Sequence, residues 1–180
     1  MQSPEDGSPK FFAFKNPEKY QGIRGWLLLF AVSLVFLNPL LALYSLGVLV
    51  FSNRQLNPVF RYYPGLFTIA LIESLIALGL VAFGAYAGIL LWRKVPGAVY
   101  VIKKYLAAVL IYGILLAISE FTLAVQYNLP PAVLLQSMLR VVGIAFYYLL
   151  WMSFLRNSKR VEVNFGKEAA NYQPLKWLGF

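Results

Sequence analysis

Apolar residues fall into four long runs along the chain, separated by short polar or basic connections. The runs cover about residues 26–51, 64–92, 105–127 and 132–155. Each is at least as long as the roughly 20 apolar residues that a helix needs to cross about 30 Å of hydrocarbon. The pattern predicts an all-α integral membrane four-helix bundle over residues 26–155. Because short connections make sequential helices antiparallel neighbours, we expect an up-down-up-down arrangement.

The first apolar run is interrupted near its middle by Asn38-Pro39. Proline has no amide hydrogen to donate, so it leaves a carbonyl of the preceding turn without its usual partner. Membrane helices tolerate such a break when neighbouring groups satisfy the freed carbonyl. We therefore expect a kink at this position rather than the end of the helix.

The segments that flank the bundle differ from it in composition. Residues 1–25 begin with a polar stretch rich in Pro and Gly, which indicates disorder, and continue with cations between aromatic rings, as in an interfacial lead-in. Residues 156–180 form a basic and aromatic tail, which we expect in the cytoplasm. A solvated tail that only sets the topology is the favoured interpretation, and an amphipathic segment on the inner leaflet is the alternative.

The distribution of Lys and Arg predicts the orientation, because positively charged loops stay on the cytoplasmic side. The two connections on the opposite side hold only Arg54 and Arg61. The other side holds Lys10, Lys15, Lys19, Arg24, Arg93, Lys94, Lys103, Lys104, Arg156, Lys159, Arg160, Lys167 and Lys176. Both termini are therefore expected in the cytoplasm, where the basic rim meets anionic lipid. This topology accounts for the net charge of +9 without a nucleic-acid partner.

The composition excludes most catalytic systems. Of the 180 residues, 60% are hydrophobic and 13% are charged, which is about half the charged share of a soluble domain. The chain has no His and no Cys, and Asp6 is its only Asp. Nucleophilic systems that need a His base, and zinc sites that need His or Cys ligands, therefore lack their groups. We predict no catalytic, cofactor-binding or metal site, and no enzymatic activity.

Three ionisable residues lie inside the predicted spans. Glu73 is in the second, Glu120 in the third and Arg140 in the fourth. At ~1.5 Å of rise per residue, each lies roughly 10–14 Å from the outer end of its helix, so all three share one level. Charged groups are costly in hydrocarbon and should face the interior and pair there. Polar residues expected to join this cluster are Gln136, Ser137 and Asn38.

The cluster has two interpretations. In the first, Arg140 pairs with a carboxylate and fixes the register of an otherwise apolar bundle. In the second, one arginine does not compensate two glutamates, and the group serves proton coupling or substrate binding. A membrane enzyme with a glutamate as acid or base is a third hypothesis, but no second catalytic group accompanies it. The pair Gly84 and Gly88 adds a small-residue motif, which favours close packing within the chain or a dimer face.

Several sequence blocks resemble one family. They are G-I-R-G-W-L from Gly22, S-M-L-R-V-V from Ser137, and W-M-S-F-L-R-N-S-K-R-V-E-V-N-F from Trp151. Together with the Asn38-Pro39 break, they resemble the bacterial four-span inner-membrane family known as domain of unknown function 2569, over about residues 20–165. Besides Glu73 and Arg140, the matched motif positions are Gly25, Trp26, Trp151, Ser158, Lys159 and Arg160.

The resemblance implies a multi-pass protein of the bacterial inner (cytoplasmic) membrane and implies no activity. We expect a non-enzymatic accessory or structural subunit of a larger membrane complex, with self-association as another form of assembly. The alternative is a small proton-coupled transporter or permease that uses the Glu/Glu/Arg cluster. Four helices are few for alternating access, so a transporter of this kind would need to dimerise.

Overall fold

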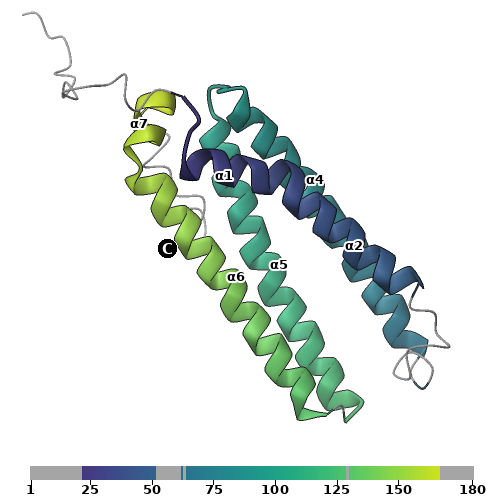
Figure 1. Cartoon of the computed structure of the whole chain (residues 1–180). Helices are drawn as coiled ribbons and strands as arrows, with labels where there is room; N and C mark the ends of the chain where they lie inside the picture. Colours follow the sequence, from purple (N-terminus) through teal and green to yellow (C-terminus); the bar gives the residue numbers. More distant parts are fainter. Residues whose placement is uncertain (1–21, 52–61, 63, 129, 167–180) are drawn as a thin grey trace, which may run out of the picture.

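The computed structural model describes residues 22–51, 62, 64–128 and 130–166, and these residues contain helices and turns but no strand. The elements, shown in Figure 1, are α1 (Trp26–Val32), η2 (Ser33–Leu37), α2 (Asn38–Phe51), α4 (Pro64–Trp92), α5 (Ala98–Gln126), α6 (Pro131–Asn157) and α7 (Lys159–Phe165). Four helical stretches are long and apolar enough to cross a membrane: Trp26–Phe51, Gly65–Trp92, Ala98–Gln126 and Leu134–Asn157. The predicted all-α fold with four helices long and apolar enough to span a membrane is confirmed.

The first span is bent at the predicted proline. The π-helical segment η2 lies between α1 and α2 and ends directly before Asn38-Pro39. Pro39 has no amide hydrogen for the carbonyl of Val35, four residues earlier, and a π turn is one way to accommodate such a gap. Figure 1 shows the ribbon changing direction between α1 and α2. The expected kink is confirmed.

The turn between α4 and α5 is shorter than the sequence predicted. Lys94 adopts a left-handed conformation (φ 54°), and the amides of Lys94 and Val95 donate to the carbonyls of Leu91 and Leu90. This pair of bonds is a Schellman motif, which ends α4 sharply. The next helix then begins at Ala98, seven residues before the predicted start of the span. The two lysines that marked the region as a linker, 103 and 104, are helical.

The hydrophobic core lies at one end of the molecule, where α1, α7 and the α4–α5 turn meet (Figure 1). Phe30 of α1 stacks on Trp151 of α6, with ring centroids 4.1 Å apart. The remaining fully or almost fully buried members of this core are Leu27, Ala31, Leu34, Ala87, Leu91, Val99, Ile102, Tyr105, Leu106, Leu155 and Val161. By contrast, α2 has no buried residue. The packing is therefore concentrated toward this end.

The first part of the basic tail folds back onto this core. Val161 of α7 is fully buried, and Phe165 is partly buried against the same cluster. The backbone amide of Gly22 donates to Asn164 Oδ1 at 2.9 Å, which ties the segment before α1 to α7. A solvated tail is therefore wrong for residues 159–165. The interfacial lead-in before residue 22, the connection at 52–61 and the tail after residue 166 lie outside the described residues.

The helices pack in a row rather than in a closed square. Extensive contacts join α2 and η2 to α4, α4 to α5, and α5 to α6. Within the described residues, α2 and α6 share no extensive contact. At the end that contains the hydrophobic core, α1 closes the bundle. Farther from that end, one side of the bundle is open.

The glycine motif in α4 makes contacts inside the chain. A Cβ on Gly84 would lie 2.8 Å from the Tyr105 ring, and a Cβ on Gly88 would lie 2.8 Å from Val35. Gly84 therefore lets α5 approach α4 closely, and Gly88 lets η2 approach it. This is packing within the chain, as the first of the two interpretations predicted.

Candidate functional site

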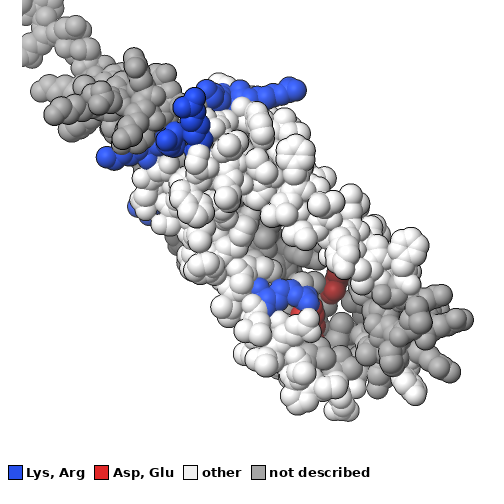
Figure 2. All heavy atoms as spheres, in the orientation of Figure 1, with Lys and Arg blue, Asp and Glu red and all other residues white. Residues whose placement is uncertain are grey.

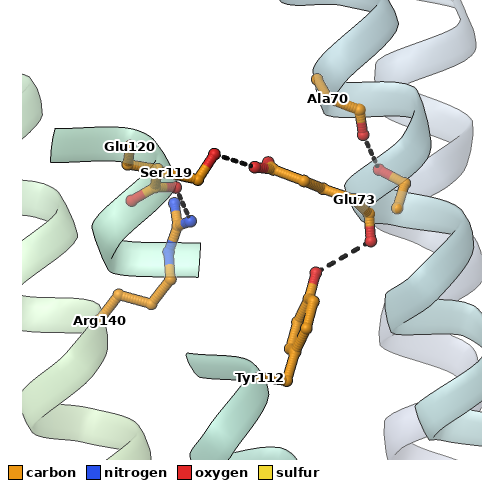
Figure 3. A network of polar contacts seen from close by, with 7 residues as sticks. Ala70, Glu73, Tyr112, Ser119, Glu120 and Arg140 are labelled. Atoms are coloured by element: carbon orange, nitrogen blue, oxygen red, sulfur yellow. Dashed lines mark hydrogen bonds and ion pairs between the residues drawn. The ribbon is translucent and has the colours of Figure 1, made fainter. Parts of the chain in front are cut away.

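Three neighbouring helices bring the predicted ionisable residues together. Glu73 lies on α4, Glu120 on α5 and Arg140 on α6 (Figure 3). The Arg140 guanidinium forms an ion pair with Glu120 Oε1. The expected level shared by two carboxylates and one cation is present, and Arg140 pairs with Glu120.

Two hydroxyl groups of α5 donate hydrogen bonds to Glu73. The Ser119 hydroxyl donates to Glu73 Oε1 at 3.0 Å, and the Tyr112 hydroxyl donates to the Glu73 backbone carbonyl at 2.9 Å. Figure 3 shows Ser119 beside Glu120, so adjacent residues of α5 contact the two partners. Ser74, next to Glu73, bonds within its own helix to the carbonyl of Ala70.

These groups are not sealed inside the bundle. The Arg140 side chain is 42% exposed and that of Glu120 is 18% exposed. Figure 2 shows a hollow on the open side of the row, with acidic side chains within it and a basic side chain at its edge. We call this hollow, with Glu73, Ser119, Glu120 and Arg140, the polar cleft. It lies away from the basic end (Figure 2).

The other predicted members of the cluster lie in different surroundings. On α6, Ser137 is buried and Gln136 is exposed, one turn before Arg140. Asn38 is not part of the cleft. It lies beside the phenol groups of Tyr105 and Tyr147, and Tyr147 is two helical turns, about 10 Å, from Arg140. The expectation that Asn38 joins the cluster is wrong, because the bend at η2 brings this part of the first span against the core.

The hydroxyl partners of Glu73 were not predicted, although the sequence contains a signal for them. Tyr112 and Ser119 are seven residues apart on α5, which places them on one face of the helix. Ser119 also immediately precedes Glu120. A hydroxyl group beside Glu120 and another about two turns before it on the same helix are therefore the signal.

The cleft contains carboxylate oxygens that can accept hydrogen bonds, and its two carboxylates outnumber its one guanidinium group. Glu120 Oε2 is buried and has no hydrogen-bond partner among the described residues. Over the same residues, no group of three His, Cys, Asp or Glu side chains could hold a metal ion. The chemistry available is thus the binding of a cation, a proton or a hydrogen-bond donor by carboxylate oxygens.

A second group of predicted positions lies at the basic end. Trp151 is buried in the core, Gly25 precedes α1 with a positive φ of 61°, and Ser158 forms the break between α6 and α7. Trp26 is 67% exposed, and Lys159 is exposed at the start of α7. Figure 2 shows most of the visible Lys and Arg side chains gathered at this end. Its exposed described cations are Arg24, Arg93, Lys94, Lys104, Arg156 and Lys159.

Two further basic residues of this end, Arg160 and Lys103, have buried atoms. Arg160 Nη1 is buried and has no hydrogen-bond partner in the described part of the chain. Lys103 is 1% exposed beside the core residues Ile102 and Tyr105. Its long aliphatic stem allows this position to pack with apolar neighbours.

Comparisons with protein-family models, with curated proteins and with solved structures found no match.

Proposed function

We propose that the chain is a non-enzymatic subunit of a larger membrane complex and that it binds its partner through the polar cleft. The observation behind this proposal is the exposure of Arg140, of whose side chain 42% is uncovered within an apolar span. A guanidinium and a carboxylate facing lipid are costly, whereas the same pair is stable against protein or in a hydrated cavity. A partner helix on the open side would cover the pair.

The packing of the chain supports the same function. The residues of α2 are all exposed or half-buried, and α2 and α6 are not closed against each other along the cleft. The basic end, in contrast, has a fully buried core with the stacked pair Phe30 and Trp151. A chain that is well packed at one end and open at the other has the form of a subunit whose open side is completed by assembly.

The setting of this subunit is part of the proposal. We place it in a bacterial inner membrane as an up-down-up-down bundle with both termini in the cytoplasm. The gathering of the described cations at the end where α1 and α7 lie supports this orientation, and these cations would meet anionic headgroups. The resemblance to domain of unknown function 2569 supports the bacterial membrane.

Site-specific photocrosslinking in native membranes tests the docking function. Gln136 is exposed one turn from Arg140 on the same face of α6, and Met138 is exposed about 200° around the helix from Gln136. A benzoylphenylalanine at position 136 should give one crosslinked product of defined mass. The same probe at position 138 is the matched control and should give little of that product.

Native mass spectrometry of the chain isolated in mild detergent gives the second readout. A complex of fixed stoichiometry is expected, and Arg140→Leu should lower its share. A bare monomer in detergent, together with crosslinks that do not differ between positions 136 and 138, would overturn the docking function.

A second candidate function is a proton-coupled or cation-coupled transporter, favoured by the unpaired Glu120 Oε2 within the cleft. In liposomes containing a pH-sensitive dye, the chain would then move protons, and Glu73→Gln and Glu120→Gln would reduce the flux. Glu162→Gln, on α7 and far from the cleft, is the control. Flux that is the same in all three variants excludes these carboxylates from transport.

A further inference from the structure

The polar cleft has an uneven charge. Its described ionisable residues are two carboxylates, Glu73 and Glu120, and one guanidinium, Arg140, which pairs with Glu120. Glu73 is held by the Ser119 hydroxyl, which is a neutral donor. Counted as ionised groups, the two carboxylates exceed the one guanidinium by a single negative charge, and Arg140 acts on both of them. Glu120 Oε2, buried without a hydrogen-bond partner, is an acceptor within this group.

We infer that the partner docked on this face is a membrane-spanning helix with one Lys or Arg at the level of Glu73 and Glu120. This inference rests on the proposed docking function and adds the chemistry of the partner. A charge inside a membrane is stable when an opposite charge compensates it, and an added cation would balance the second carboxylate. The cleft lies along spanning helices, so a helix of similar length brings its side chain to the required depth.

The same charge count argues against a second copy of this chain as the occupant. Two copies joined through their clefts would bring four carboxylates and two guanidinium groups together. The surplus negative charge of one copy would face that of the other, and like charges placed opposite each other disfavour an interface. A partner with complementary charge has no such penalty.

A synthetic helix of known charge tests the inference with the full-length chain in liposomes. The probe has about 20 Leu and Ala residues, with one Lys about eight residues from its outer end at ~1.5 Å per residue. Two matched probes have Leu or Glu at that position. Because the chain has no Cys, Met138→Cys accepts a single donor dye on the side of α6 away from Arg140, and energy transfer to a labelled probe reports binding.

The Lys probe should bind about tenfold more tightly than the Leu probe, which corresponds to about 1.4 kcal/mol. The Glu probe should bind more weakly than the Leu probe. Glu73→Gln and Glu120→Gln should each reduce the preference for Lys, since each removes a negative charge with little change in shape. Glu162→Gln should leave the preference unchanged.

The possible failures are distinguishable. Equal binding of the Lys and Leu probes, or an unchanged preference in both Gln variants, would overturn the cationic partner and leave the docking function standing. If two labelled copies of the chain show energy transfer to each other and the probes do not bind, the occupant is a second copy. This result would also overturn the cationic partner. Binding of no probe overturns the inference, and the docking function fails with it only if crosslinking from position 136 also fails.

Discussion

Arg140 pairs with only one of the two glutamates of the cleft, and this pairing determines how the cleft should respond to substitution. Its guanidinium pairs with Glu120, whereas Glu73 is bound by Ser119 and Tyr112. The energetic coupling in the cleft should therefore be largest between Arg140 and Glu120. Glu73 should be coupled more strongly to Ser119 than to Arg140.

A pair of double-mutant cycles measures this difference. The cycle of Glu120→Gln with Arg140→Gln should give a coupling of about 1 kcal/mol, within the range of polar contacts between membrane helices. The cycle of Glu73→Gln with Arg140→Gln should give less than half of that. Both use the free energy of unfolding of the purified chain in bicelles. A larger coupling for Glu73 than for Glu120 would contradict the pairing.

Sequence alone predicted the ionisable part of the cleft because depth follows from position along a helix. Glu73, Glu120 and Arg140 share a level as soon as the helices are aligned by their ends. Asn38 was misplaced because its direction depends on the bend at η2, and the pattern of apolar residues does not give the rotation of a helix after a π turn. The partner of Arg140 could not be chosen either, since both carboxylates lie at the same depth.

At the next scale, the contacts between α4 and its neighbours depend on the absence of side chains at two glycines. A Cβ at Gly88 would lie 2.8 Å from Val35 Cγ2 and 2.9 Å from Leu34 Cβ, so η2 would have to move away. Gly88→Ala should lower the free energy of unfolding by about 1–3 kcal/mol, as overpacking does in cores. Gly79→Ala is the matched control in the same helix, because nothing lies within 4 Å of its Cβ position.

The control should be neutral or slightly stabilising, because Ala favours a helix over Gly by about 1 kcal/mol. Thermal unfolding of both variants in one detergent compares them directly. Equal destabilisation at positions 79 and 88 would show that the close approach of η2 to Gly88 does not decide the effect.

Val161 is the one fully buried side chain of α7, beside partly buried Phe165 and the hydrogen bond from Gly22 to Asn164. Val161 is 0% exposed, whereas Lys159 on the same helix is exposed. Val161→Ala should weaken the attachment by about 2 kcal/mol, in line with cavities in other cores. Hydrogen exchange of the amides in residues 159–165 should become faster in this variant.

Lys159→Ala should leave that exchange unchanged, because the side chain contributes little to the packed face. The amides of α5 and α6 near the cleft should keep their protection in both variants. If Val161→Ala and Lys159→Ala behave alike, the contact of α7 with the core contributes little to its order.

The ends of the elements show where sequence patterns lose precision. The hydropathy of the third run predicted its existence and its end near residue 127, but placed its start at residue 105 because two lysines precede it. Backbone hydrogen bonds within a helix are indifferent to these charges, so α5 continues back to the Schellman turn after Trp92. The helix α7 was not predicted because seven residues with four polar side chains form no long periodic pattern.

Across the whole molecule, the basic end is packed and charged, and the opposite part is open and holds the cleft. Four spans could be predicted because an apolar run of this length has few other solutions. The arrangement of the helices in an open row could not be predicted, since α2, α4, α5 and α6 have apolar residues around most of their circumference. The sequences of such helices do not show which pairs of helices are in contact and which are not.

The orientation of the chain can be tested at three exposed positions, because the protein has no Cys of its own. Pro96 lies in the α4–α5 turn, Lys159 begins α7, and Gln126 ends α5. Cations gather at the end that contains the first two, and positive charge is retained in the cytoplasm. In spheroplasts, a membrane-impermeant maleimide should label Gln126→Cys, and should label Pro96→Cys and Lys159→Cys only after the membrane is opened.

Labelling of all three variants in detergent separates sidedness from burial, because every position should then react. The reverse pattern in spheroplasts would place the basic end outside and contradict the charge rule for this chain. It would also move the polar cleft into the inner half of the membrane. The Lys or Arg of the docking helix would then have to lie nearer the cytoplasmic end, so a probe with its Lys shifted to that depth should become the tighter binder.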